Sequence, residues 1–196
     1  MLVGVKTDFP PFGYIDPAGE IQGFDADLSR YLGRALFEEE PGVELVPVTS
    51  GGRIPLLYSE LIDVIIATMT ITEDRQRVLD FSNPYFVTGS MLLTPKDSSI
   101  QSVQDLAGKH VAVLEGAVQQ SDLRLIAPEA RLIAFKSLPE ALQALKNKRV
   151  DALCQDDVAV LTAARMNPDL SIAGKHSCQD PMPWRCARAT ASSWAG

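Results

Sequence analysis

The 196-residue sequence contains only three cysteines and two histidines, and it has no long hydrophobic run. Cys154, Cys178 and Cys186 lack the close pairing typical of zinc ligands, so we expect neither a metal nor a disulfide framework. His110 and His176 lie far apart in the sequence, and neither has an obvious nucleophile beside it. No segment reaches the roughly 18 apolar residues of a membrane-spanning helix, and no phosphate-binding glycine loop is present. These absences argue against a metal centre, a nucleophilic enzyme and a membrane domain.

Positive charge is also scarce. Lysine and arginine number 18 against 25 acidic residues, a net charge of -7, whereas a nucleic-acid surface needs a basic footprint. Apolar residues make up 46% of the chain, enough for the core of one large domain or two small lobes. The chain opens directly on the apolar run "MLVGV" and shows no signal peptide, so we expect any leader to be absent from this sequence.

Short apolar segments alternate with helical patterns, which is typical of α/β folds with mainly parallel strands. A helix is expected from about Phe24 to Leu36, with Asp25 near its start as a cap or dipole partner. A second round of strands and helices begins near Ser102. The segments "SELIDVIIATM" and "NKRVDALCQDD" echo each other, which indicates two lobes of like architecture.

We therefore predict a first lobe over residues 1–88, a hinge or crossover over 89–95 and a second lobe over 96–181. Ligands of such sheets bind at the carboxyl ends of the strands. The segment "IIATMTITEDR" lies at such an end, where a buried strand runs into three threonines, two acids and an arginine.

The ordered set "GVKTDFPPFGY", "GEIQGFDADLSRYLG", "RIPLLYSELIDVIIATMTITEDRQRVLDFSNPYF", "SVQDLAGKHVAVLEG" and "EALQALKNKRVDAL.QDD" resembles the amino-acid-binding branch of the periplasmic solute-binding proteins, family 3. The resemblance runs in order from residue 2 to about residue 180. It implies a two-lobe periplasmic-binding-protein-like α/β fold (type II) that closes on one free amino acid. It also implies delivery to the membrane permease of an ABC importer from the periplasm or cell surface, as a monomer, without chemistry or cofactor.

The resemblance assigns roles in the first lobe. Arg75 offers a planar fork of donors to the ligand α-carboxylate, and Thr70 adds a hydroxyl and a backbone N–H. The Thr68 carbonyl is placed to accept from the ammonium, and Phe9 matches the aromatic residue that covers the ligand. From the residues alone, Arg75 could instead cap a helix end and the threonines could be ordinary strand residues.

In the second lobe, Asp156 matches the family position that meets the ammonium. From the residues alone, the "DD" pair could instead cap a helix, Asp157 in particular. Gly116 and Ala117, in the turn "EGAV", are expected to hold the carboxylate through backbone amides from Glu115 to Ala117. Many family members carry threonine or serine at the two positions after Gly116, so this chain lacks those hydroxyls.

Lys6 and Arg53 lead us to expect an acidic ligand, glutamate or aspartate, with glutamine or asparagine as the next choice. Both cations are predicted to face the ligand side chain, and similar "GVK.D" and "RIP" patterns occur in aspartate and glutamate binders. Lys6 could otherwise be a solvated strand-end residue, and Arg53 a surface residue at a helix start. Two further classes share the fold, namely cyclohexadienyl dehydratase and ligand-binding sensor domains.

Residues 182–196, "MPWRCARATASSWAG" from Met182 onward, contain no acid and no helical period. Deleting one T from a G+C-rich frame that encodes P-Y-A-L-A-V-R-P-G-D-S-E-L-V-G reproduces this tail. We therefore interpret the tail as non-native, the product of a frameshift after Pro181 that leaves the fold C-terminally incomplete, with apolar sheet edges exposed.

Overall fold

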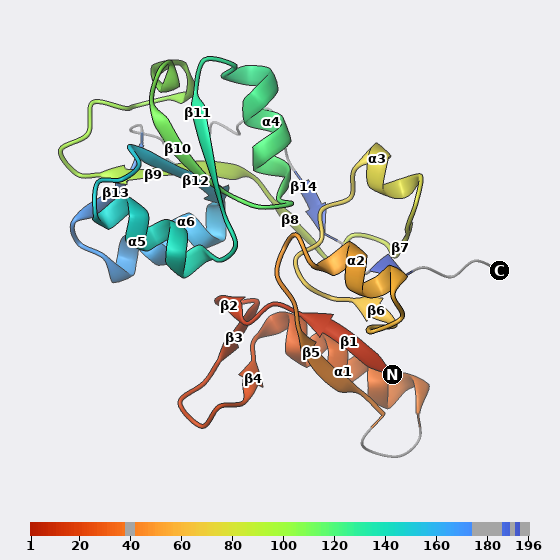
Figure 1. Cartoon of the computed structure of the whole chain (residues 1–196). Coiled ribbons are helices and arrows are strands. Elements are labelled where there is room, and N and C mark those ends of the chain that lie inside the picture. Colours follow the sequence, from red (N-terminus) through yellow and green to blue (C-terminus); the bar gives the residue numbers. More distant parts are fainter. Residues whose placement is uncertain (38–41, 174–185, 189–190, 193–196) are drawn as a thin grey trace. The chain divides into compact units, whose positions relative to one another are not determined.

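The computed structural model describes residues 1–37, 42–173, 186–188 and 191–192. The chain divides into two compact units, unit 1 with Met1–Val87 and Cys186–Gly196, and unit 2 with Thr88–Arg185. Each unit is built on its own mixed sheet with helices, and the chain can be followed from red to blue in Figure 1. Within the described residues, no helix is both long enough and apolar enough to cross a membrane.

Unit 1 contains a five-stranded sheet of mixed direction. Its strands lie in the order β5 (Glu44–Pro47), β1 (Leu2–Val5), β6 (Val64–Ile65), β15 (Ala191–Ser192) and β7 (Asp80–Phe81). Strands β5, β1 and β6 are parallel, and β15 is antiparallel to both β6 and β7. The carboxyl ends of three parallel strands therefore lie at one edge of this sheet.

The remaining elements of unit 1 are short, apart from the first helix. They are β2 (Asp8–Phe9), β3 (Gly13–Ile15), β4 (Ile21–Gln22), α1 (Phe24–Leu36), α2 (Arg53–Tyr58), α3 (Glu73–Gln76) and β8 (Phe86–Thr88), which pairs with β14 (Cys186–Arg188). Helix α1 has the predicted bounds. It begins after Gly23, whose φ of 117° places its backbone where a Cβ would lie 2.5 Å from the Phe12 carbonyl oxygen.

Unit 2 repeats this plan. Its sheet has the order β11 (Arg131–Phe135), β10 (His110–Leu114), β12 (Ala152–Asp156), β9 (Ser90–Pro95) and β13 (Leu170–Ile172). The first three strands are parallel, β9 is antiparallel to β12, and β13 is antiparallel to β9. The helices are η1 (Val103–Leu106), α4 (Val118–Ile126), α5 (Leu138–Lys146) and α6 (Asp157–Met166).

Both cores explain the apolar runs of the sequence. In β10, Val111 to Leu114 are all buried, as is usual for a parallel strand with elements packed on both faces. In unit 1, Val3 and Val5 of β1 pack with Ile66, which directly follows β6. Each unit therefore has an apolar core of its own.

The structure adds detail to two segments that the sequence singled out. The predicted hinge, residues 89–95, is almost entirely strand β9 of the unit 2 sheet, because its side chains Leu92 and Leu93 are buried in the core. The tail was expected to leave apolar sheet edges exposed, and in the structure β15 pairs with β6 and with β7. Backbone ladders do not depend on side-chain identity, so an unusual sequence can still complete a sheet. Apart from β14 (Cys186–Arg188) and β15, the tail lies outside the described residues.

Candidate functional site

The carboxyl edge of the unit 1 sheet carries most of the predicted ligand residues. Lys6 directly follows β1, Ser50 lies three residues after β5, and Thr68 lies three residues after β6. Because the carboxyl ends of parallel strands share one edge, the segments that follow β1, β5 and β6 all leave the sheet there (Figure 1).

Lys6 is a buried cation at this edge, with its side chain only 1% exposed. Its Nζ lies 3.0 Å from Asp8 Oδ1 and donates to Ser50 Oγ at 3.0 Å. The same nitrogen lies 5.4 Å from the centroid of the Phe9 ring. The solvated lysine considered from the sequence is therefore wrong, and the cation is paired with a carboxylate that sequence reasoning missed.

Arg53, the first residue of α2, is also buried, so the surface residue considered from the sequence is wrong. Its Nε donates to the Ser50 carbonyl at 3.0 Å, and its Nη1 donates to the carbonyls of Ala67 at 2.8 Å and Thr68 at 3.2 Å. The guanidinium therefore fastens the loop after β5 to the segment after β6. These donors hold protein carbonyls, which weakens the case for Arg53 as a receptor for a ligand carboxylate.

Thr68 has an uncommon backbone conformation, with φ at 48° in a β-branched residue. Its N–H donates to Asp25 Oδ2 at 2.9 Å, and Asp25 Oδ1 accepts from the Tyr85 hydroxyl at 3.1 Å. Asp25 is fully buried and holds the strained segment in place from helix α1. The sequence suggested only a cap or dipole partner, because an acid in a first helical turn gives no sign of a partner 43 residues away.

Thr70 and Arg75 are joined by one hydrogen bond, from Arg75 Nη1 to the Thr70 carbonyl at 2.8 Å. Thr70 is buried and Arg75 is partly exposed. Helix α3 is capped by Thr72, whose hydroxyl accepts from the Arg75 N–H, so the cap of this helix is a threonine and Arg75 lies inside the helix. The bond to Thr70 therefore fixes the direction of a partly exposed guanidinium.

In unit 2, Asp156 is the last residue of β12, with 4% exposure. Its Oδ1 accepts from Gln119 Nε2 at 2.9 Å, and the same amide nitrogen donates to Ser90 Oγ at 3.0 Å. The Asp156 N–H donates to Gln155 Oε1 at 2.9 Å. Sequence reasoning missed Gln119, Ser90 and Gln155, because one glutamine or serine among many carries no distinguishing signal.

The two carboxylates that sequence left as alternatives have different surroundings. Asp157 accepts from the Thr88 hydroxyl, from the Gly89 N–H at 3.2 Å and from the Val158 N–H at 2.7 Å. It therefore ties the start of α6 to the segment before β9, and Asp156 is the carboxylate held beside buried amide groups.

Gly116 and Ala117 precede helix α4, with Gly116 at a φ of 71° and Ala117 as the N-cap. The Glu115 N–H donates to the Phe135 carbonyl at 2.9 Å, and the Ala117 N–H donates to the Leu114 carbonyl at 3.1 Å. Two of the three amides expected to hold a carboxylate therefore serve protein carbonyls. The first-turn amides of α4 begin one residue later, at Val118.

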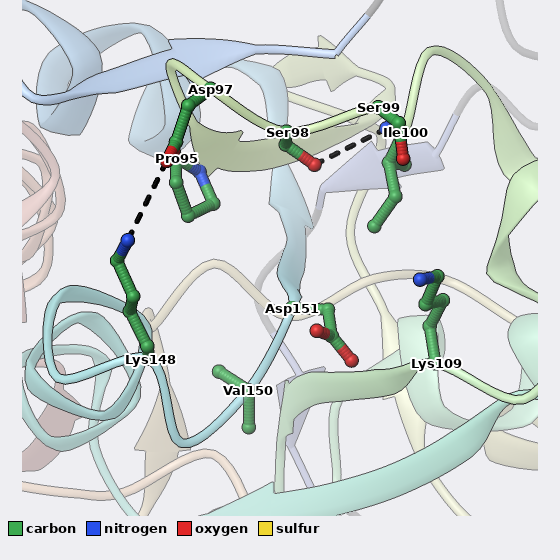
Figure 2. Close-up of a pocket in the computed structure, with 9 residues that line it drawn as sticks. All are labelled: Pro95, Asp97, Ser98, Ser99, Ile100, Lys109, Lys148, Val150 and Asp151. Atoms are coloured by element: carbon green, nitrogen blue, oxygen red, sulfur yellow. Dashed lines mark hydrogen bonds and ion pairs between the residues drawn. The ribbon is translucent and has the colours of Figure 1, made fainter.

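A separate hollow of about 260 Å³ lies at the other edge of the unit 2 sheet, beside the starts of β10 and β12. Figure 2 shows Lys148 reaching toward Asp97 on one side of it, 3.5 Å from Nζ to Oδ2, with Lys109 on the other side and Asp151 between them. None of the predicted ligand residues lines this hollow. Among the residues placed by the structure, no cluster of three or more histidine, cysteine or acidic side chains could hold a metal ion.

Comparison with known proteins gives consistent matches. The family model described as bacterial extracellular solute-binding proteins, family 3, matches residues 1–158. The glutamine-binding protein of Geobacillus stearothermophilus is 38% identical over 192 residues, covering 97% of this chain and 73% of the relative. The ABC transporter glutamine-binding protein GlnH of Bacillus subtilis (strain 168) is 39% identical over 183 residues, covering 92% and 67%.

Solved structures agree. Holo ArgBP from T. maritima has a TM-score of 0.89 at 34% identity, covering 98% of this chain and 82% of that one. The predicted two-lobe α/β fold of the type II periplasmic binding proteins is therefore confirmed.

Proposed function

Because the chain belongs to family 3 of the bacterial extracellular solute-binding proteins, we propose that it captures one free polar amino acid for an ABC importer. It works outside the cytoplasm, in the periplasm or at the cell surface, and hands its ligand as a monomer to permease subunits in the membrane. No chemical step and no cofactor takes part, and no nucleic acid binds. The observation that carries this proposal is the family match over residues 1–158, which spans all nine predicted ligand residues.

The main-chain groups of the ligand define the first part of the proposed site. In unit 1, the Arg75 guanidinium and the Thr70 hydroxyl and N–H bind the α-carboxylate, since a planar fork of donors fits two carboxylate oxygens. In unit 2, Asp156 binds the α-ammonium, and the first turn of α4 from Val118 adds backbone donors for the carboxylate. Gly116 and Ala117 serve by shaping the turn that starts this helix.

The ligand side chain defines the second part of the proposed site, and two observations change our expectation from the sequence. Glutamate and aspartate were favoured because Lys6 and Arg53 were expected to present two cations. Lys6 is instead paired with Asp8, and Arg53 holds backbone carbonyls. We therefore place a neutral side-chain amide, as in glutamine, ahead of the acidic amino acids. Two of the relatives are named as glutamine-binding proteins, which supports this order.

Calorimetric titration of the full chain with glutamine, glutamate and arginine tests the proposal. Glutamine is expected to bind tightest, and Arg75→Lys is expected to weaken glutamine binding by about tenfold or more, since lysine cannot form the two-pronged contact. Tightest binding by glutamate would restore the acidic ligand. A folded chain that binds no amino acid, or that returns a chemically altered ligand, would overturn the proposed function.

A further inference from the structure

Asp157 accepts hydrogen bonds from two distant parts of the unit 2 chain. Its Oδ1 accepts from the Thr88 hydroxyl and from the Val158 N–H, and its Oδ2 accepts from the Gly89 N–H at 3.2 Å. The Asp157 N–H in turn donates to the Gly89 carbonyl at 2.8 Å. Both backbone groups of Gly89 are therefore bound by one residue that lies 68 positions further along the chain.

These bonds lie at a corner where a strand passes directly into a helix. Strand β12 ends at Asp156 and helix α6 begins at Asp157, so no loop separates the two elements. Asp156 is the N-cap of α6 but makes no side-chain cap hydrogen bond. The antiparallel register of β12 and β9 runs as far as Asp156 opposite Ser90. The bonds between Asp157 and Gly89 extend this attachment by one residue and hold the start of α6.

We infer that Asp157 is a positioning residue for amino-acid binding, because its bonds to Thr88 and Gly89 fix the place of the neighbouring Asp156 carboxylate. The inference rests on the proposed function, which assigns Asp156 to the α-ammonium of the ligand. If the first residue of α6 shifts, the carboxylate one residue earlier shifts with it. A charge-assisted hydrogen bond weakens steeply with distance and angle, so a small displacement costs affinity.

Two variants separate the hydrogen bonds of Asp157 from its charge. Asp157→Ala removes all three accepted hydrogen bonds and is expected to weaken glutamine binding by about tenfold. Thr88→Val removes one donor and leaves the Asp157 charge in place, so binding should weaken by about two- to threefold. A loss in both variants assigns the effect to the hydrogen bonds, since only Asp157→Ala changes the charge.

A ligand without the ammonium separates positioning from a general structural role. Glutaramate is glutamine with a hydrogen in place of the α-ammonium, so it lacks only the contact assigned to Asp156. Asp157→Ala should therefore weaken glutamine binding by about tenfold and glutaramate binding by less than about twofold. A merely structural role would weaken both ligands alike. Ligand-detected NMR measures both, because it reaches weak binding.

The side-chain amide of Gln119 gives a second readout without any ligand. Its Nε2 donates to Asp156 Oδ1 at 2.9 Å, so the NMR signals of this amide report on the position of the carboxylate. They are expected to shift in Asp157→Ala. This readout decides the inference if glutaramate binds the wild type too weakly to measure: shifted signals with weaker glutamine binding support it, and unmoved signals overturn it.

Glu140 provides a matched control in the same unit. It is an exposed acid in the first turn of α5, as Asp157 is an acid in the first turn of α6. Glu140→Ala therefore removes the same charge from an equivalent helix position. It should leave the glutamine-to-glutaramate ratio of dissociation constants within about twofold of the wild type.

The experiment titrates glutamine and glutaramate into the wild type, Asp157→Ala, Thr88→Val and Glu140→Ala, with thermal unfolding of each protein. A preference for glutamine that falls in Asp157→Ala, falls less in Thr88→Val and stays in Glu140→Ala supports the inference. If Asp157→Ala does not fold, Thr88→Val decides it.

Two results overturn the inference alone, namely an unchanged preference in the folded variants and an equal weakening of both ligands. A wild type that binds no amino acid overturns the proposed function itself. A wild type that prefers glutamate is tested in the same way with glutarate, because glutarate lacks the same ammonium.

Discussion

Asp25 is a single buried carboxylate with two long-range partners, and it shows how one residue can hold a strained segment. It accepts from the Thr68 N–H and from the Tyr85 hydroxyl. Thr68 needs such support, because a left-handed conformation in a β-branched residue costs about 1–3 kcal/mol. The proposed ligand contacts of Thr68 and Thr70 therefore depend on a residue that itself lies inside helix α1.

Asp25→Asn is expected to destabilise the protein by about 1–3 kcal/mol. Both partners of Asp25 donate hydrogen bonds, and the NH2 group of asparagine is a donor that cannot replace a carboxylate oxygen opposite the Thr68 N–H. Urea unfolding measures this change. Tyr85→Phe is the control, since it removes one hydrogen bond and leaves the carboxylate in place, and its cost should be about 0.5–1.5 kcal/mol. Equal stability of Asp25→Asn and the wild type would contradict the role assigned to Asp25.

At the scale of elements, helix α4 links two strands of the unit 2 sheet. The Gln119 amide, in the first turn of the helix, donates to Asp156 at the end of β12 and to Ser90 at the start of β9. The start of α4, which would supply backbone donors, and Asp156, which would meet the ammonium, are thus held at fixed positions relative to each other. Side-chain networks of this kind rigidify a site when their members are satisfied.

Gln119→Leu is expected to weaken amino-acid binding by about tenfold, because Asp156 loses the donor that fixes its orientation. Ser90→Ala, which removes only the second acceptor, should weaken binding less. Isothermal titration at matched thermal stability separates a loss of affinity from a loss of folding. Unchanged affinity in Gln119→Leu would show that β12 alone positions Asp156.

A second element, helix η1, makes stability depend on pH. The backbone N–H of Gln101, and then the Ser102 side chain, lower the pKa of Asp105 below its ordinary value of 3.8. A carboxyl group whose folded pKa is depressed stabilises the fold above its unfolded pKa and loses that contribution as pH falls through the folded pKa. The capping box of η1 should therefore weaken below about pH 4.

Asp105→Asn tests this pH dependence. The variant should be less stable than the wild type near neutral pH, and the gap should narrow as pH falls below about 4, because the wild type then loses the same contribution. Thermal unfolding across this range measures the gap. Asp97→Asn makes the same charge change at an exposed residue and is expected to have a smaller effect. A gap that stays constant into acid would contradict the prediction.

At the scale of the whole molecule, the feature to explain is the C-terminal tail, residues 182–196, which we interpret as frameshifted. The structure places β14 and β15 in unit 1, with β15 between β6 and β7. Strand β15 has two residues and supplies few backbone hydrogen bonds to the sheet. The proposed frameshift therefore predicts that the folded protein is only marginally stable.

Replacing residues 181–196 by the restored frame, P-Y-A-L-A-V-R-P-G-D-S-E-L-V-G, is expected to raise the thermal midpoint by a few degrees, about what 1 kcal/mol gives in a domain of this size. Sequencing the locus is the independent check. A gene with no G+C-rich stretch of the proposed kind, or a restored chain no more stable than the original, would contradict the frameshift.

Much of the fold could be predicted from the sequence because its signals are local and repeated. Helix α1 has the bounds that its apolar spacing indicates, and the run of β10 is buried as its continuous apolar character suggests. The apolar pattern of "IPLLYSELI" favours a helix, but α2 ends at Tyr58. That of "DVIIATM" favours a strand, but β6 is regular only at Val64–Ile65. After Ile65 the chain turns toward Asp25 and Arg53, and such long-range bonds leave no local pattern.

The sequence by itself determined the α/β class, the membership of the family and the likeness of the two halves, because apolar periodicity and ordered motifs follow directly from residue identity. Only the tertiary structure decided the electrostatics of the candidate site. Lys6, expected from the sequence to face the ligand as a cation, forms an ion pair with Asp8, and Arg53 donates hydrogen bonds to backbone carbonyls. The physical reason is that the field of a charge depends on which opposite charge and which dipoles the fold brings within about 3–4 Å, and a list of residues does not contain that distance.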